Sequence, residues 1–414
     1  MRRPGPETVA ARVGAPQPAP GGAPLVEPPA LAAVEAFASL DDLEAAMAGG
    51  RGGYRRLGNP SVGRLQEALG ALEGWGGVDD PACRVTSSGQ AALLLAVTGL
   101  VGERRRGIVL LRPSYGGTQA LLAGPLARLG VAPTILDLPP AGEVAHQLDG
   151  VEAVLDGGVA AVVAEAIGNP LLGILDVPRL TEMCRAAGVA TVIDGTFATP
   201  FLLRPLELGA DVVVHSLTKQ LAGHSDVVGG AVLVRAGHPA AERLDADCGT
   251  LGVGMSPFDA FLALRGLRTA GLRVARSSSS AAALAEVAAG HPAVRAVHHP
   301  GLRSAEEEAL AARLLPRGRG AMLTLDLGDR AAVTRLLRAL PEVRLAPSLG
   351  DVATTVSHPA ATSHRGLAAE ERDALGIGGG LLRFSVGIEE VGDLVAELRD
   401  GLDAVIAGRD GAGG

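Results

Sequence analysis

The stretch Asp211-Val-Val-Val-His-Ser-Leu-Thr-Lys-Gln-Leu-Ala-Gly-His-Ser-Asp226 contains Lys219, the only lysine in a chain of 414 residues. The chain has 37 basic residues, so the other 36 are arginines. A primary amine can lose its proton and form an imine with an aldehyde, whereas a guanidinium stays charged and is a poor nucleophile. The retained lysine is therefore a candidate for a Schiff base.

The residues around Lys219 predict a strand followed by a loop. The stretch 211–214 is short and consists mainly of β-branched, apolar residues, as is typical of a buried strand. Loops at the carboxyl ends of strands carry the ligands of α/β sheets. Ser216 and Thr218 place hydroxyls on both sides of the amine, which suits a phosphate ester. A surface lysine in a polar loop is the alternative, and the arginine-rich composition makes it the weaker one.

The composition indicates a large aliphatic core and leaves few classes of partner. Hydrophobic residues make up 47% of the chain and aromatic residues 2%, and the net charge is −8. Cys83, Cys184 and Cys248 lie far apart, which indicates neither a disulfide framework nor a metal site and fits a reducing cytoplasm. Apolar runs fall short of the roughly 20 residues of a membrane span, and the N-terminus lacks a secretory signal. We therefore expect a soluble, cytoplasmic protein with no nucleic-acid or membrane partner.

Short apolar strands alternate with helical segments along the middle of the chain. The strand candidates are residues 83–86, 108–111, 159–164, 189–193, 212–214 and 231–234. This βα alternation predicts an α/β fold with a mainly parallel, doubly wound sheet. A different order follows: a long Ala/Leu/Arg stretch at 257–289, strands at 322–327 and 381–386, and helices at 331–340 and 391–406. That order predicts a smaller α+β domain at the C-terminus.

We expect three parts: an arm at residues 1–60, a ligand-binding domain at 61–255 and a C-terminal domain at 256–414. The first 30 residues or so are rich in Pro, Gly and Ala, which predicts an extended or disordered segment without a regular helix. Ser61 is expected to cap the helix that follows it. The run Ser277–Ser280 is expected to form a solvated face.

A pyridoxal phosphate held by Lys219 would need three further groups, and the chain offers a candidate for each. Asp194 follows the strand 189–193 and could keep the pyridine nitrogen protonated. Ser88-Gly89-Gln90 stands between a strand and a helix, where amides and the helix dipole can bind a phosphate. Tyr115, one of only two tyrosines, could stack on the ring. Taken alone, the aspartate could be a turn cap and the serine a plain helix cap.

These residues belong to a longer series of motifs, and the whole series resembles a known family. The motifs are Tyr54-x-Arg56 with Asn59-Pro60, Ser88-Gly89, Tyr115-Gly-Gly-Thr, Asn169-Pro170, Asp194-Gly-Thr-Phe-Ala-Thr-Pro, Ser216-x-Thr-Lys219, Gly223-His-Ser-Asp226, Ser348-Leu-Gly350 and Arg383-Phe-Ser-Val-Gly-Ile-Glu-Glu390. In this order they resemble the pyridoxal-phosphate enzymes of the cystathionine γ-synthase, cystathionine γ-lyase and methionine γ-lyase family. The resemblance covers most of the chain, from Tyr54 to Glu390.

The resemblance implies fold type I, a homotetramer of two tight dimers, and a role for each motif residue. It implies that Lys219 and Tyr115 are catalytic, with the lysine forming the imine, the tyrosine stacking on the ring and Asp194 pairing with the pyridinium. No metal is implied. The remaining implied roles are phosphate binding by Ser88, Gly89, Gln90, Ser216 and Thr218, contact with the neighbouring subunit's phosphate by Tyr54 and Arg56, and substrate binding by Arg383, Ser348 and Asn169.

The implied activity is γ-replacement on an activated homoserine-type amino acid, through quinonoid and vinylglycine-type intermediates. A lyase that eliminates from the γ- or β-position of cystathionine or another sulfur amino acid is the alternative, and a protein that binds the cofactor without turnover is a third reading. Ala353 stands where cystathionine-using relatives often carry Glu, and Gly117 stands where methionine γ-lyases often carry Cys. Gly195 stands where many relatives have Asn. These departures leave a specialised amino acid or nucleophile open.

Overall fold

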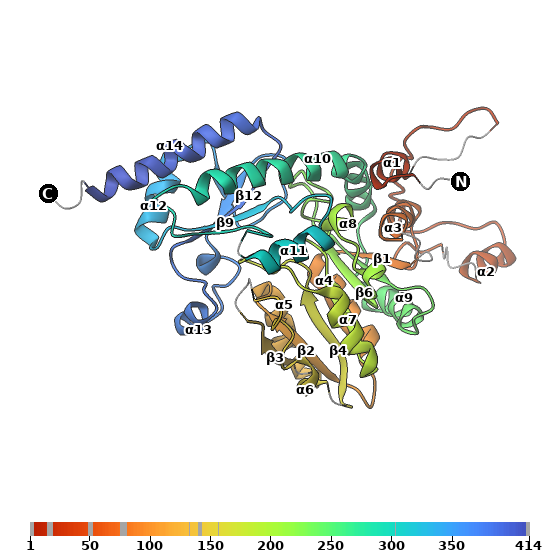
Figure 1. The fold of residues 1–414 in the computed structure, drawn as a ribbon. Helices are drawn as coiled ribbons and strands as arrows, with labels where there is room; N and C mark the ends of the chain where they lie inside the picture. Colours follow the sequence, from red (N-terminus) through yellow and green to blue (C-terminus); the bar gives the residue numbers. More distant parts are fainter. Residues whose placement is uncertain are drawn as a thin grey trace.

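The protein is described by a computed structural model that covers residues 4–14, 20–48, 53–74, 81–131, 133–139, 143–155, 157–302 and 304–410. The described strands form a sheet of seven and a sheet of five. The helix α10 (Pro257–Ala289) runs past both sheets (Figure 1). Near one of its ends lie α1 (Pro6–Arg12) and α3 (Pro60–Glu73), and near the other lie α12 (Arg330–Ala339) and α14 (Val391–Asp410).

The larger sheet is mainly parallel, as the βα alternation predicts. Its strand order is β1-β7-β6-β5-β4-β2-β3, and only β7 runs antiparallel to its neighbours. The strand β3 was not expected, because three of its five residues are exposed and its sequence has no apolar run. The bounds are β1 (Ala82–Thr86), β2 (Gly107–Arg112), β3 (Pro133–Asp137), β4 (Val159–Glu165), β5 (Ala190–Asp194), β6 (Val212–Ser216) and β7 (Gly230–Val234).

Both faces of the larger sheet are buried, which explains why its central strands are continuous apolar runs. Ile108 and Leu110 of β2 pack on one face with α4 and α9, whereas Val109 and Leu111 pack on the other with α3, α7 and α10. The helices around this sheet are α3 (Pro60–Glu73), α4 (Gly89–Leu100), α5 (Gly116–Leu121), α6 (Val151–Val154), α7 (Val177–Ala186), α8 (Thr199–Leu202) and α9 (Ala240–Leu251).

The smaller sheet is mixed and follows the order β10-β11-β12-β9-β8, in which only β10 and β11 pair in parallel. It forms a separate core with α12, α14 and the C-terminal half of α10. The bounds are β8 (Ala296–His298), β9 (Met322–Asp326), β10 (Arg344–Leu345), β11 (Thr355–Ser357), β12 (Leu381–Ser385), α11 (Ala305–Leu314), α12 (Arg330–Ala339), α13 (Ala369–Ala374) and α14 (Val391–Asp410). The α/β class with a smaller α+β part is thus confirmed, while the division at residues 60 and 255 stays a prediction.

The Ala/Leu/Arg stretch forms one helix, α10, and its serine run is not a solvated face. Ser277, Ser278 and Ser280 are buried. The Ser277 hydroxyl donates a hydrogen bond to the carbonyl of Arg273, and the Ser278 hydroxyl accepts one from the amide of Gly320. Small hydroxyls fit here because α10 is covered on several sides. Among the helices that the structure describes, none combines the length and apolar character needed to cross a bilayer.

The N-terminal segment contains a helix, α1 (Pro6–Arg12), so the expectation of no regular helix there is wrong for these residues. A helix tolerates proline in its first turn, where Pro6 stands. Ala10 is 1% exposed and packs against α10 and α3. Glu7 forms an ion pair with Arg317. Tertiary packing therefore outweighs the poor local propensity. A second helix, α2 (Leu40–Ala48), follows; residues 1–3 and 15–19 lie outside the described part.

Asn59, and not Ser61, caps α3. The Asn59 side chain accepts hydrogen bonds from the amides of Ser61 and Val62, at 2.9 and 3.4 Å. Pro60 occupies the first helical position, which makes the residue before it the cap. Ser61 instead accepts the amide of Ala30 and fixes the arm against the helix.

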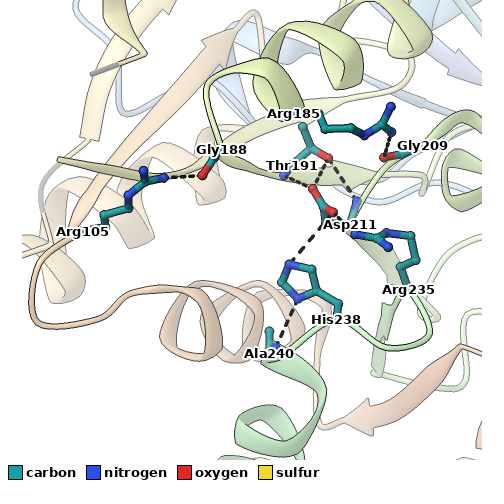
Figure 2. Close-up of polar contacts among 9 residues, drawn as sticks. All are labelled: Arg105, Arg185, Gly188, Thr191, Gly209, Asp211, Arg235, His238 and Ala240. Carbon is teal, nitrogen blue, oxygen red and sulfur yellow. Dashed lines mark hydrogen bonds and ion pairs between the residues drawn. The ribbon is translucent and has the colours of Figure 1, made fainter. Parts of the chain in front are cut away.

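Asp211 holds the amino ends of β5 and β6 in register, at the edge of the sheet opposite Lys219. Its carboxylate accepts the amide and the hydroxyl of Thr191, at 3.0 and 3.2 Å, and the Arg235 guanidinium at 2.9 Å (Figure 2). The register pairs Asp194 with Val214. The two strands therefore end side by side, with Asp194 on one and the loop to Lys219 on the other.

Candidate active site

A cavity of about 590 Å³ lies where the carboxyl edge of the larger sheet meets residues of the smaller one. The carboxyl ends of parallel strands and their loops supply most of its wall, as expected for an α/β fold. Of the residues predicted for the site, the cavity is lined by Ser88, Gly89, Gln90, Tyr115, Asn169, Asp194, Ser216, Thr218, Lys219, Ser348 and Arg383.

Lys219 lies in the loop after β6, with its amine inside the cavity. The Nζ atom donates a hydrogen bond to the Ser348 hydroxyl at 2.9 Å. Burial, together with the positive charge of Arg383, lowers the pKa of the Lys219 amine to about 8. A substantial fraction of the amine is therefore neutral near physiological pH, which is the form that attacks an aldehyde.

Asp194 ends β5 and faces the cavity. One carboxylate oxygen accepts the amide of Thr196 at 2.8 Å. Burial raises the pKa of Asp194, against the opposing effects of the Thr196 hydrogen bonds and of His215. A cation in the cavity would restore the charged form, so this carboxylate suits a protonated ring nitrogen.

The start of α4 forms a cradle for an anion. Ser88 caps the helix with its side-chain oxygen. The amides of Gly89 and Gln90 have no acceptor within the helix, because they belong to its first turn. A side chain on Gly89 would lie 3.0 Å from the Cβ of Ser216, so glycine keeps the cradle open beside the Ser216 and Thr218 hydroxyls. This donor set is the kind that holds a phosphate.

Tyr115 precedes α5 and lines the cavity with 44% of its surface exposed. Gly117 makes room for its ring, because a side chain at Gly117 would overlap the tyrosine and lie 2.7 Å from the Gln90 amide nitrogen. Gly116 likewise leaves room for the Ser363 carbonyl, so the loop that contains Ser363 packs directly on the tyrosine loop. The position of the aromatic ring therefore depends on two adjacent glycines.

Arg383 and Asn169 also line the cavity. Arg383 is 4% exposed and donates from a terminal nitrogen to the Asn169 side-chain oxygen at 2.6 Å. Its guanidinium also lies 5.9 Å from the ring centre of Phe197. Burial lowers the pKa of Arg383 to about 10, so it stays charged at neutral pH. Among the described residues its Nε has no partner, which leaves a donor for a carboxylate.

The site contains a second partly buried carboxyl, Glu165, to which sequence reasoning assigned no role. Glu165 ends β4 and pairs in register with Asp194 of β5. Its two oxygens accept the amides of Tyr115 and Asn169, at 2.6 and 2.8 Å. Burial and the charge of Asp194 raise the pKa of Glu165 to about 8. The signal that could have found it is a carboxyl residue that ends a buried strand, the same signal that identifies Asp194.

Tyr54 and Arg56 do not line this cavity. Both are exposed, Tyr54 at 45%, and the Arg56 guanidinium lies 5.3 Å from the centre of the tyrosine ring. Arg56 also donates to the carbonyl of Gly249. Their implied contact with a phosphate in the neighbouring subunit stays a prediction.

The residues present fit pyridoxal phosphate. The cavity combines an amine with a lowered pKa, a buried carboxylate, an anion cradle at a helix N-terminus and an aromatic ring. Within the described ranges no three His, Cys, Asp or Glu side chains gather in a way that could hold a metal ion.

Comparison with known proteins agrees with this fit. A family model described as Cys/Met metabolism PLP-dependent enzyme matches residues 16–403. An L-methionine gamma-lyase from Porphyromonas gingivalis is 38% identical over 355 residues, which cover 85% of this chain and 86% of that protein. An O-succinylhomoserine sulfhydrylase from Mycobacterium tuberculosis is 36% identical, with 83% of this chain and 82% of that protein covered.

A solved structure shows the same similarity over almost the whole chain. The cystathionine gamma synthase from Xanthomonas oryzae pv. oryzae, in complex with aminoacrylate and cysteine, matches with a TM-score of 0.86 and 38% identity. The match covers 97% of this chain and 98% of that structure. With its lysine, carboxylate and phosphate cradle in one cavity, this chain belongs to the Cys/Met metabolism enzymes that depend on pyridoxal phosphate.

Proposed function

We propose that this protein catalyses γ-replacement on an activated homoserine-type amino acid. The observation that carries the proposal is the bond from the Lys219 amine to Ser348, at 2.9 Å, in a cavity that Arg383 also lines. An amino acid whose α-carboxylate binds Arg383 would then have its Cα next to this amine. The same amine that holds the cofactor is thus in reach of the proton to be removed.

The reaction gives a task to four residues of the site: Lys219, Arg383, Asn169 and Asp194. Pyridoxal phosphate, when bound, supplies an aldehyde for the substrate amine and a ring that accepts electrons from Cα. Lys219, released as a neutral amine, takes the proton from Cα as a general base and returns it at a later step. Arg383 and Asn169 bind the α-carboxylate and orient the Cα–H bond. Asp194 holds a negative charge where the ring nitrogen has to stay protonated.

The second proton of the reaction leaves from Cβ. Its loss allows the leaving group on Cγ to depart. Tyr115 and Lys219 are the groups that can accept it, because both line the cavity. The polar residues Thr362, Ser363 and Arg365 also line the cavity, and they could contact the departing group and the incoming nucleophile.

Replacement is favoured over elimination from methionine by the polar side chains of Thr362, Ser363 and Arg365 in the lining and by Gly117. Polar side chains suit an ester leaving group and a polar nucleophile better than a methyl thioether. A cysteine at Gly117 would overlap Tyr115, so this tyrosine position and that cysteine exclude each other. The lyase reading stays the second candidate because an L-methionine gamma-lyase is 38% identical to the chain.

We also propose that two chains share their active sites. Tyr54 and Arg56 are exposed and lie outside the cavity of their own chain. The same N-terminal part exposes Leu25, Leu31 and Leu57, which are 86%, 64% and 46% exposed. Such an apolar surface suits contact with a second copy. A homotetramer and a cytoplasmic location stay predictions from the sequence.

The reaction type is tested by giving the enzyme O-succinyl-L-homoserine or O-acetyl-L-homoserine, with and without a thiol. With a thiol we expect a thioether amino acid as the main product, and without one we expect slower release of a 2-oxo acid. Mass spectrometry of the amino acids and a 2-oxo acid assay measure both. Faster 2-oxo acid release from methionine or cystathionine than any replacement would assign the protein to the lyases.

The pKa of Lys219 predicts how the cofactor-free protein captures pyridoxal phosphate. Only the neutral amine attacks the aldehyde, so below pH 8 the capture rate should rise about tenfold per pH unit, and above pH 8 it should level off. Stopped-flow absorbance measures the rate. In Arg383→Gln the rise should extend to higher pH, because the positive charge that lowers the amine pKa is removed. A wild-type rate that still climbs steeply at pH 10 would contradict the lowered pKa.

Shared active sites are tested by mixing two variants that are each impaired at a limiting concentration of cofactor. Lys219→Ala lacks the imine-forming amine, and Arg56→Ala should lose cofactor affinity by about tenfold if the guanidinium binds a phosphate in the other chain. A hybrid of the two contains one site with both native residues, so mixing should restore part of the activity. No recovery after subunit exchange, or a monomer by light scattering, would refute the shared site.

A further inference from the structure

Glu165 is a partly buried carboxyl in the wall of the cavity that has no task in the reaction above. It stands at the end of β4, between β2, which leads to Tyr115, and β5, which ends at Asp194. Both of its oxygens are occupied by backbone amides, those of Tyr115 and Asn169. A carboxylate engaged in this way is poorly placed to take a proton from a substrate, but it is well placed to hold two loops.

The two loops that Glu165 holds follow different strands of the larger sheet. Tyr115 follows β2 and carries the ring that faces the cofactor position, whereas Asn169 follows β4 and binds Arg383 with its side chain. The bonds form a continuous chain: Tyr115 amide to Glu165 at 2.6 Å, Asn169 amide to Glu165 at 2.8 Å, and Arg383 to the Asn169 side chain at 2.6 Å. A shift of Glu165 would therefore move both the aromatic ring and the carboxylate-binding pair.

The position is costly, which indicates a role beyond filling space. Glu165 is partly buried and lies beside a second carboxyl, Asp194, so burial and repulsion both disfavour its charge. The partial compensation comes from the two amides and from Arg383. Replacing such a group by an apolar residue would often cost little stability. Its presence in the wall of the cavity thus favours a functional use.

We propose that Glu165 is a positioning residue that fixes Tyr115 and the Asn169–Arg383 pair as one unit, so that the substrate α-carboxylate binds in register with the cofactor ring. This inference rests on the proposed function for the identity of the substrate, but the coupling itself concerns any amino acid bound at Arg383. Glu165 acts through other residues and does not touch the reacting atoms.

The test is Glu165→Gln in the cofactor-loaded enzyme. Glutamine has nearly the same shape, but only one of its terminal atoms accepts a hydrogen bond, so it can hold one loop and not both. We expect the KM for the homoserine ester to rise about tenfold or more, with a smaller change in kcat. We also expect weaker binding of L-2-aminobutyrate, which has no γ-leaving group, measured by the absorbance change of the bound cofactor.

Two comparisons separate positioning from a merely structural role. Glu371→Gln is the matched control, because Glu371 pairs with Arg112 near the start of the tyrosine loop but lies outside the cavity, and Arg112 keeps Asp137. This control should bind L-2-aminobutyrate like the wild type. In a double variant with Asn169→Ala, the loss should be smaller than the product of the two single losses, because both act on Arg383.

The outcomes are distinct. Unchanged binding and absorbance in Glu165→Gln, or losses that multiply fully with Asn169→Ala, would overturn the inference. If Glu165→Gln does not fold, Glu165→Asp provides the measurement, since its shorter carboxylate cannot reach both loops and the same loss of binding is expected. A wild type that does not convert any homoserine ester, but whose binding of L-2-aminobutyrate still depends on Glu165, would refute the proposed function and leave the inference standing.

Discussion

The reactivity of this site depends on a partly buried amine that has no carboxylate partner among the residues that the structure describes. Lys219 donates to the hydroxyl of Ser348, and the charge that lowers its pKa besides burial is that of Arg383. A carboxylate at the same place would raise the pKa and keep the amine charged. Lys219 belongs to the larger sheet, whereas both neighbours belong to the smaller sheet and its loops. The chemistry therefore requires the two sheets to be docked against each other.

Parallel strands bring the other charges to the same edge. The contact of Asp211 with Thr191 fixes β5 against β6 at their amino ends, so Asp194 and the loop to Lys219 emerge together (Figure 2). Glu165 lies beside Asp194 because β4 and β5 are parallel neighbours whose register pairs these two residues. The carboxyls of Asp194 and Glu165, gathered in one cavity with Lys219 and Arg383, are unfavourable for folding and are typical of catalytic sites. The rigid sheet tolerates them because each has hydrogen-bond partners or a cavity in which a charged ligand can bind.

Local sequence patterns were sufficient to locate the central strands and to place Lys219 and Asp194 after two of them, because buried strands and the residues that follow them carry strong signals. Ser348 and Arg383 came from the family resemblance, since nothing in their own neighbourhood indicates a cavity more than 120 residues away along the chain. Glu165 received no role because its function depends on which strands lie next to β4, and a single sequence does not state that order. The helix α1 and the buried serines of α10 depend in the same way on tertiary packing.

The most direct test of the account is to reduce the cofactor-loaded protein with borohydride and map the labelled peptide by mass spectrometry. The account predicts a pyridoxyl group on Lys219, and no such label in Lys219→Arg. Because Lys219 is the only lysine, the N-terminal amine is the only other primary amine of the chain that could be labelled. A label at that position, or no stable label at all, would contradict the role of Lys219.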